Sequence, residues 1–327
     1  MISIIGGSGF IGSSLARRLS EQQLNFSIGD LQKSKGFFDK SSILDVRSIN
    51  DLRSKLKGNI AVNLAAIHRD NIPDPDEYYS TNVEGAHALC QVCEEKGINK
   101  IIFTSSVAVY GFAPSGTGED GAIEPFSEYG RTKALAEKVY REWRDRDPEN
   151  RSLIVVRPTV VFGEGNRGNV YNLFNQIYSG PFVFIGNGKN RKSMAYVENL
   201  SAFLLKCIET DERYAVFNYV DTPDFTMNEL VSFVRGKLRG RATVGIRIPK
   251  FIGLMFGYAA DAFAKLGVKT PISSGRVKKF CTSSEFSSAK SELGGFEAPY
   301  SLREGLEKTL EAEFTNPDSG RQTFYAE

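Results

Sequence analysis

A glycine-rich turn near the start of the chain constrains the fold more than any other feature. Residues 2–5 (ISII) are apolar and mostly β-branched, which is typical of a buried strand. Gly6, Gly9 and Gly12 follow at intervals of three, and residues 13–19 place apolar side chains at helical spacing. Glycine permits a tight turn and a close approach of phosphate to the backbone, and a helix N-terminus attracts that phosphate. The sequence therefore predicts a strand–turn–helix unit that binds the diphosphate of a dinucleotide.

A carboxylate follows the second predicted strand. Residues 24–29 (LNFSIG) predict that strand, and Asp30 comes 18 residues after Gly12. An acid at this place can bond the ribose hydroxyls of NAD and would repel the 2′-phosphate of NADP. Lys33 and Lys35 follow closely. The sequence therefore favours NAD and keeps NADP as the weaker alternative. Asp45, followed by Val46 after a third apolar stretch, is expected near the adenine amino group.

Strands and helices alternate through the first 165 residues. Strands are predicted at 60–66, 100–105 and 152–156, and helices at 82–96 and 129–146. Alternation of this kind implies a parallel sheet with helices on both faces. After Gly163 the sequence becomes more irregular. The predicted fold class is therefore α/β, a Rossmann-type doubly wound parallel sheet.

The bulk composition excludes several partners. The chain of 327 residues has 41 basic and 39 acidic residues, so its formal net charge of +2 gives no argument for nucleic acid or membrane lipid. The chain opens directly on a strand, which predicts no signal peptide. Cys90 and Cys93 form a C-x-x-C pair, but it falls within a predicted helix and no second pair follows. We expect no metal site, and free buried thiols in a reducing cytoplasm.

An apolar segment at residues 248–266 has several interpretations. It could be a lid helix, a helix that packs within the protein, a dimer face or an interfacial membrane helix. Asp261 and Lys265 interrupt the segment, and its own polar face is not notably basic. The sequence favours packing or a lid, so membrane contact is not expected.

Tyr129 and Lys133 are spaced four apart at the head of a predicted helix, which puts them on one helical face. A free tyrosine has a pKa near about 10 and is a poor base at neutral pH. A nearby cation favours the phenolate, so we expect Lys133 to lower the pKa of Tyr129. The pair could then move a proton to or from an alcohol.

Together with the glycine turn, these motifs resemble the extended short-chain dehydrogenase/reductases, in particular the NAD-dependent nucleotide-sugar epimerase/dehydratase family. Residues 63–66 (NLAA), 81–85 (TNVEG) and 104–111 (TSSVAVYG) are similar to motifs that the family carries in this order. Tyr129 follows Ser106 by 23 residues, as the family pattern expects. The resemblance extends from residue 2 to about residue 310.

The resemblance implies roles for individual residues. Tyr129 would be the acid/base, Ser106 its hydroxyl partner at the reacting oxygen of the substrate, and Lys133 the residue that holds the nicotinamide ribose. The implied cofactor-binding residues are Gly6, Gly9, Phe10, Ile11, Gly12, Asp30, Asp45, Val46, Leu64, Ala65, Ala66, Tyr129, Lys133 and Pro158.

The resemblance also implies two domains. Residues 1–165, with a returning segment at about 194–220, would form the NAD-binding Rossmann domain. Residues 166–193 and 221–327 would form a smaller C-terminal α/β substrate-binding domain. A homodimer through two helices of the cofactor domain is expected on the same ground.

The sequence departs from the family around the substrate. Thr159 stands where many sugar epimerases have an Asn that meets the nucleotide diphosphate, which puts that contact in doubt. Lys192, with Arg191 as the alternative, and Arg276 resemble the family's later diphosphate-binding positions. Asn169 completes the implied substrate-binding set.

The function that the sequence and the resemblance favour is that of an NAD-dependent epimerase. It would act at C4 of a UDP-hexose or UDP-N-acetylhexosamine through a transient 4-keto sugar. The alternative is a nucleotide-4-keto-sugar reductase of surface-polysaccharide synthesis, which the segment from Arg157 to Thr159 also resembles. A 4,6-dehydratase is disfavoured because Val107 and Ala108 stand where that chemistry usually has acids. The intact set of Ser106, Tyr129 and Lys133 argues against a regulatory protein without chemistry.

Overall fold

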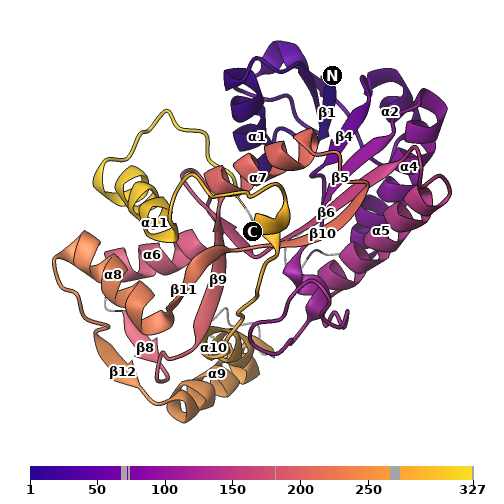
Figure 1. Ribbon diagram of the computed structural model, residues 1–327. Helices are drawn as coiled ribbons and strands as arrows, with labels where there is room; N and C mark the ends of the chain where they lie inside the picture. Colours follow the sequence, from indigo (N-terminus) through magenta and orange to yellow (C-terminus); the bar gives the residue numbers. More distant parts are fainter. Residues whose placement is uncertain (68–71, 73, 181, 266–272, 326–327) are drawn as a thin grey trace.

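The computed structural model describes residues 1–67, 72, 74–180, 182–265 and 273–325 (Figure 1). Its main sheet has seven strands in the order β10-β6-β5-β4-β1-β2-β3, and every neighbouring pair is parallel. The strands are β1 (Ile2–Ile5), β2 (Phe26–Asp30), β3 (Ser41–Ile43), β4 (Ile60–Asn63), β5 (Lys100–Thr104), β6 (Ser152–Pro158) and β10 (Tyr214–Tyr219). The predicted α/β fold with a doubly wound parallel sheet is confirmed.

Helices cover both faces of this sheet. One face is covered by α1 (Phe10–Glu21) and α7 (Val197–Glu209), which contact each other. The other face is covered by α2 (Ile49–Lys55), α4 (Gly85–Lys96) and α5 (Glu128–Asp145). Because the central strands are buried on both faces, β4, β5 and β6 contain apolar runs and do not alternate apolar with polar residues.

The strand order reverses between β1 and β4. From β1 the chain runs outward through β2 and β3, and from β4 it runs the other way through β5 and β6. In sheets of this kind the ligand binds at the carboxyl ends of the two strands that flank the reversal. The glycine turn leaves β1 at this edge, so the topology agrees with the predicted dinucleotide site.

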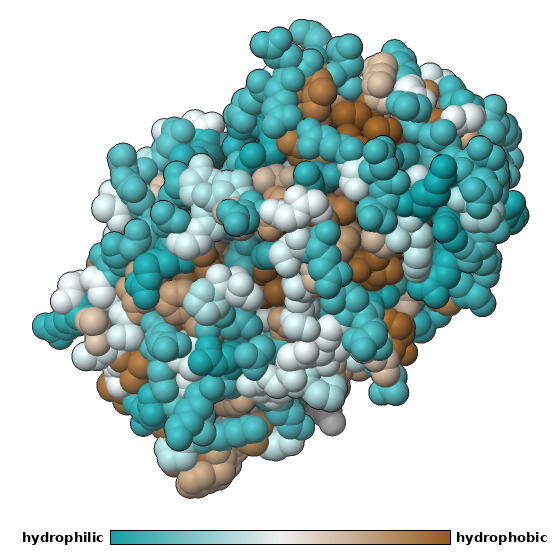
Figure 2. Space-filling model, in the orientation of Figure 1, coloured by the Kyte–Doolittle hydropathy of each residue, from teal (hydrophilic) through white to brown (hydrophobic). Residues whose placement is uncertain are grey.

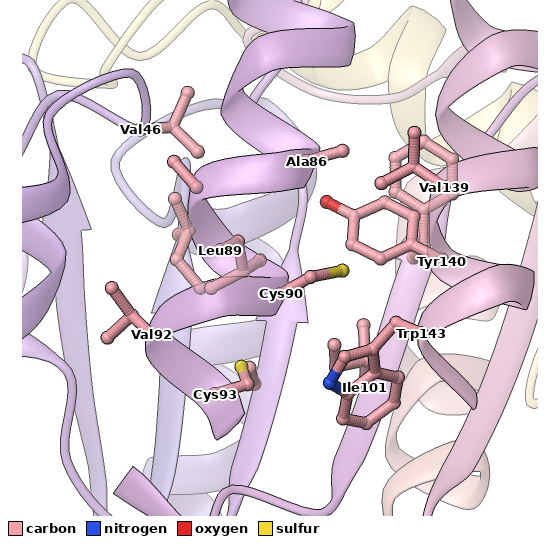
Figure 3. Packing of buried hydrophobic residues seen from close by; sticks show 14 of the residues in the cluster. Val46, Ala86, Leu89, Cys90, Val92, Cys93, Ile101, Val139, Tyr140 and Trp143 are labelled. Carbon is pink, nitrogen blue, oxygen red and sulfur yellow. The ribbon is translucent and has the colours of Figure 1, made fainter. Parts of the chain in front are cut away.

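A buried apolar cluster joins α4 and α5 on one side of the sheet (Figure 3). Cys90 and Cys93 of α4 lie in this cluster with Tyr140 and Trp143 of α5. Both cysteines are buried and free, as predicted, and burial raises the pKa of Cys93 to about 12. A thiol held protonated in this way is a poor nucleophile and a poor metal ligand.

The second part of the molecule contains two smaller sheets. One has the order β11-β9-β7 and the other pairs β12 with β8. The strands are β7 (Val160–Phe162), β8 (Val183–Ile185), β9 (Arg191–Tyr196), β11 (Asp221–Thr226) and β12 (Ile246–Ile248). The helices are α6 (Asn169–Ser179), α8 (Met227–Arg239), α9 (Lys250–Lys265), α10 (Ser274–Cys281) and α11 (Leu302–Leu310), and a one-turn helix α3 (Asp76–Tyr79) precedes α4.

Local sequence explains where several of these helices begin. Thr226 ends β11 and begins α8 with a capping box to Glu229, and Ser301 begins α11 in the same way with Glu304. Ser127 caps α5 by accepting a hydrogen bond from the Gly130 N–H. The predicted helix at 82–96 is less regular, because residues 80–84 form a π turn before α4.

The chain returns to the glycine turn near its C-terminal end. Phe324 exchanges backbone hydrogen bonds with Gly165 and Arg167, and its ring centroid lies 5.5 Å from that of Phe10. Aromatic packing and backbone pairing therefore fix residue 324 against the start of α1.

Candidate active site

The glycine turn is built on two close backbone contacts. Gly6 has a φ of +76°, and a Cβ there would lie 2.5 Å from the backbone nitrogen of Ala65. A Cβ on Gly12 would lie 2.5 Å from Cα of Gly7. Gly9 begins α1 and no side chain caps the helix. The first N–H groups of α1, on Phe10 and its neighbours, are therefore left for an anion such as a diphosphate.

Asp30 lies at the end of β2, beside this turn. Its carboxylate accepts a hydrogen bond of 2.9 Å from the Ser8 N–H and one of 3.4 Å from the Gln32 N–H. Burial raises the pKa of Asp30, against the lowering effect of these backbone bonds. The glycine cradle and this carboxylate together fit NAD: the cradle would hold the diphosphate and Asp30 the adenosine ribose.

The other predicted cofactor residues lie along the same edge of the sheet. Leu64, Ala65 and Ala66 follow β4, and the Ala65 N–H is held by the side chain of Asn63. Pro158 ends β6. Val46 is buried against Gly85 of α4.

Asp45 is already paired in the structure. Its carboxylate accepts bonds of 3.0 and 2.7 Å from the Arg47 guanidinium, which lowers the pKa of Asp45. An adenine amino group would therefore share Asp45 with Arg47.

Ser106, Tyr129 and Lys133 come together at the carboxyl end of β5. Ser106 follows β5, and its hydroxyl accepts a hydrogen bond of 3.1 Å from the Ala108 N–H. The Ser106 side chain also lies close enough to Tyr129 to lower the pKa of its hydroxyl. Gly130 makes this possible, since a Cβ there would lie only 2.4 Å from the Ala108 carbonyl oxygen. The serine thus caps a turn and also meets the tyrosine.

Lys133 is the most deeply buried member of the three, with a side chain that points back to the sheet. Its Nζ donates a hydrogen bond of 2.6 Å to the Thr104 carbonyl and lies 4.5 Å from the centroid of the Phe103 ring. Burial lowers the pKa of Lys133 to about 7, and the Glu137 carboxylate acts in the opposite direction.

The expected effect of Lys133 on Tyr129 is corrected by this geometry. Burial raises the pKa of Tyr129 to about 12, and the opposing influence comes from the hydrogen bond with Ser106. Lys133 does not lower the pKa of Tyr129, because burial favours the neutral form of both side chains. The side chain that acts on the pKa of Tyr129 in this structure is therefore Ser106 and not Lys133.

A buried polar network lies behind the three residues, and sequence reasoning missed it. Arg157 forms an ion pair with Glu137, and it donates a bond of 2.6 Å to the Tyr110 hydroxyl. Tyr110 in turn donates to the Asn218 side chain at 2.8 Å. Glu137 lies one helical turn after Lys133, which is the only hint that the sequence offers. The network links α5 to β6 and β10 and fixes the helix that carries Tyr129.

Ser105 is a further residue that sequence reasoning did not single out. Its hydroxyl oxygen is buried and has no hydrogen-bond partner within the part of the chain that the structure describes. A buried polar group without a partner is costly, so this hydroxyl is available to a ligand at the end of β5.

The predicted substrate residues are more dispersed. Thr159 is buried, and its hydroxyl donates to the Tyr219 carbonyl at 3.1 Å. This side chain therefore holds the link between β6 and β7 to the end of β10. Asn169 is exposed at the first turn of α6.

Lys192 and Arg276 lie on neighbouring elements. Lys192 on β9 is partly buried, and its Nζ donates a bond of 2.9 Å to the Lys279 carbonyl of α10. Burial lowers the pKa of Lys192 to about 8. Arg276 is exposed in the first turn of α10.

The apolar segment forms α9 in its described part, residues 248–265, and packs on α10 with one face only; a lid stays a prediction, and residues 266–272 lie outside the described residues. Phe251 and Met255 of α9 are 70% and 62% exposed, so they do not pack within the protein. None of the helices within the described residues is long and apolar enough to cross a membrane. The described residues also contain no cluster of His, Cys, Asp and Glu that could hold a metal ion.

Comparisons with known proteins bear on this site. The family model "NAD dependent epimerase/dehydratase family" matches residues 2–219. The chain is 42% identical over its whole length to the N-acetyl-alpha-D-glucosaminyl-diphospho-ditrans,octacis-undecaprenol 4-epimerase of Escherichia coli O157:H7, of which it covers 99%. It is 25% identical to the UDP-glucose 4-epimerase of Vibrio cholerae, with 95% of this chain and 94% of that protein covered.

A solved structure shows the same fold. MoeE5 in complex with UDP-glucuronic acid and NAD has a TM-score of 0.76 and 23% identity, with 97% of this chain and 99% of that chain covered. The family model matches from β1 through β10, the elements that carry the glycine turn, Asp30, Ser106 and Tyr129. The expected cofactor, NAD, is the one that the family's description names. The chain belongs to the NAD-dependent epimerase/dehydratase family.

Proposed function

We propose that this protein is a 4-epimerase of an N-acetylhexosamine joined through a diphosphate to a polyprenol. The observation that carries the proposal is the placement of Ser106, Tyr129 and Lys133 at the carboxyl end of β5, beside the dinucleotide cradle. The full-length similarity to the Escherichia coli protein supports the choice of sugar and carrier. The proposal keeps the expected 4-epimerase chemistry and replaces the expected nucleoside beyond the diphosphate with a polyprenol.

In the proposed reaction Tyr129 is the acid/base. In its phenolate form, its oxygen takes the proton of the sugar 4-hydroxyl, and the resulting phenol later returns that proton to the same sugar oxygen. The Ser106 hydroxyl positions both oxygens, and Lys133 would hold the nicotinamide ribose. When bound, NAD supplies the acceptor of the hydride from C4 and its donor on return, so none is consumed.

Inversion at C4 requires the 4-keto sugar to present its opposite face before it is reduced. The sugar must therefore be held loosely while the rest of the substrate stays anchored. A diphosphate is a suitable anchor because it is charged, and Lys192 and Arg276 are the cations that we assign to it. Lys192 is well suited, since burial strengthens its attraction to an anion.

The test is an assay without added cofactor. The purified protein is incubated in detergent with GlcNAc-diphospho-polyprenol, and the released sugars are separated by chromatography. We expect interconversion of GlcNAc and GalNAc. Conversion of UDP-GlcNAc but not of the polyprenol substrate would overturn the assignment of the carrier. Consumption of NADH or NADPH on a 4-keto sugar without interconversion would establish the reductase instead.

Two further expectations stay predictions: a cytoplasmic location and a homodimer through two helices of the cofactor domain. Light scattering on the purified protein tests the dimer.

A further inference from the structure

The helix α9 is oriented with its small residues inward. A Cβ on Gly253 would lie 2.4 Å from the Ile185 side chain, and one on Gly257 would lie 2.8 Å from the Ser274 backbone. Asp261, four residues later on the same face, accepts a hydrogen bond of 3.3 Å from the Ser274 N–H. Two glycines and one aspartate of α9 thus make close contacts with β8 and α10.

The large apolar side chains of α9 point into solvent. Five of them, together with one from the adjacent β12, are more than half exposed: Ile246, Phe251, Met255, Phe256, Tyr258 and Phe263. Figure 2 shows brown surface at the lower end of the molecule, where α9 and β12 lie in Figure 1. An exposed apolar patch of this kind marks an interaction surface.

Positive charge surrounds this patch. In the sequence from residue 246 to residue 281, one residue is acidic, Asp261, and its carboxylate is bonded inward to Ser274. The basic residues of the same stretch whose side chains the structure describes are Arg247, Lys250, Arg276, Lys278 and Lys279. The whole chain has a formal net charge of only +2, so positive charge is concentrated here.

Two neighbours of α9 contribute the basic side chains at the edge of the patch. Arg247 is exposed on β12 and Lys278 is exposed on α10. The Lys278 Nζ lies 5.3 Å from the ring centroid of Tyr258, so the cation borders the apolar surface. An apolar helix face with basic residues at its margin is typical of helices that lie in the surface of an anionic membrane.

We propose that α9, with β12 and α10, docks this protein on the surface of an anionic lipid bilayer. Phe251, Met255 and Phe256 would enter the boundary between headgroups and acyl chains, and the surrounding cations would meet lipid phosphates. The 16 residues of α9 span about 24 Å, less than the roughly 30 Å of a bilayer core, so the helix lies along the membrane and does not cross it.

Docking through α9 would also place the diphosphate anchor near the membrane surface. This inference rests on the proposed function. Lys192, our anchor for the diphosphate, is bonded to the Lys279 carbonyl of α10, and α10 contacts α9. A polyprenol would stay in the bilayer under α9 while its diphosphate reached Lys192 and Arg276. The elements that would meet the lipid and the diphosphate, α9 and α10 with Lys192 beside it, are thus in contact with each other.

The test is flotation of the purified protein with phosphatidylcholine vesicles, with and without phosphatidylglycerol, in the absence of sugar substrate. We expect the wild type to bind the anionic vesicles. The triple substitution Phe251→Ser, Phe256→Ser and Phe263→Ser should weaken this binding by at least about tenfold. The control is Phe38→Ser, which removes a residue of similar exposure (59%) from the other part of the molecule and should bind as the wild type does. Circular dichroism verifies that each variant is folded.

A charge variant tests whether the basic residues around α9 contact lipid phosphates. Lys250→Gln with Lys278→Gln should reduce the preference for phosphatidylglycerol and the sensitivity of binding to salt. The docking proposal is overturned if the wild type does not float, or if the triple variant floats equally well. Self-association through α9 without vesicle binding would assign the patch to a second copy of the chain.

The two proposals fail separately. Vesicle binding without conversion of the polyprenol substrate in detergent would overturn the proposed function and leave membrane docking supported. Conversion in detergent without vesicle binding would overturn the docking alone.

Discussion

Arg157 and Glu137 form a buried, bidentate ion pair. The Nε and Nη2 atoms of Arg157 lie 2.9 and 2.6 Å from the two carboxylate oxygens of Glu137. The side chains are only 3% and 6% exposed, so solvent does not screen them. The ion pair fixes the position of α5 against β6, and α5 carries Tyr129 and Lys133 as well as Glu137.

Glu137→Ala should destabilise the protein strongly. It would leave a buried guanidinium without its counter-ion, for which the expected loss is about 3–5 kcal/mol in the free energy of unfolding. Urea unfolding measures the loss. Glu142→Ala removes an exposed glutamate from the same helix and should change stability by no more than about 0.5 kcal/mol. Equal effects of the two substitutions would contradict the importance of the ion pair.

Tyr129→Phe should abolish most of the turnover. The substitution removes the oxygen that exchanges the proton, so the rate constant should fall by about 10²–10⁴-fold. Binding of NAD, followed by fluorescence, should persist because the glycine cradle is untouched. Tyr178→Phe, at a partly exposed position on α6, is the matched control. Turnover near the wild-type value in Tyr129→Phe would contradict the assignment of Tyr129 as the acid/base.

Asp30→Ala should weaken the binding of NAD and reduce the preference of the protein for NAD over NADP. Loss of a charge-assisted hydrogen bond to a ribose hydroxyl is worth about 1.5–3 kcal/mol, or at least about tenfold in the dissociation constant. NADP should gain relative to NAD because the repulsion of its 2′-phosphate is removed. Titration calorimetry with both cofactors measures the ratio, with the exposed Asp39→Ala as control. An unchanged ratio would contradict the role of Asp30.

Lys133→Met should flatten the pH dependence of stability. The pKa of Lys133 is about 7 in the folded protein, below the value of 10.5 of a free lysine. Above pH 7 the folded state releases this proton before the unfolded state does, so the wild type gains stability as pH rises. Between pH 7 and 8.5 the gain relative to Lys133→Met should be about 1.5 kcal/mol.

Comparison of the two proteins isolates this contribution. The buried thiols act in the opposite direction, since their raised pKa values destabilise the folded state at higher pH, but they are common to both. Parallel urea unfolding curves of wild type and Lys133→Met over this pH range would show that Lys133 is not buried as a neutral amine.

Gly130→Ala should separate Ser106 from Tyr129. The new methyl group would lie 2.4 Å from the Ala108 carbonyl oxygen, so the turn that carries Ser106 must move away from α5. A displacement of about 1 Å in a catalytic group costs roughly 10²-fold in rate. Gly180→Ala is the control, because nothing lies within 4 Å of the added atom. Wild-type activity in Gly130→Ala would show that this contact does not position Ser106.

Sequence reasoning was most successful where function depends on local spacing. The turn from Gly6 to Gly12 and the spacing of Tyr129 and Lys133 each lie within a single strand–helix unit, so a short window contains all the information. The doubly wound sheet followed from the same local alternation. The roles assigned to individual residues stay predictions.

What the sequence did not reveal depends on contacts between distant elements. Glu137 and Arg157 are 20 residues apart on a helix and a strand, and only the packing of α5 on β6 brings them together. The effect of Lys133 on Tyr129 was misjudged because spacing says nothing about burial. The orientation of α9 was missed because both of its faces are uncharged over most of their length, and the cations beside it come from β12 and α10.

The position of β10 has a consequence for how the protein is made. Residues 214–219 pair with β6, whose own strand ends at residue 158. A chain emerging from the ribosome therefore presents β6 as an open sheet edge until some 55 further residues have been synthesised. Such an edge invites pairing with other chains. The nascent protein is most exposed to aggregation, and most in need of a chaperone, in the interval between these two strands.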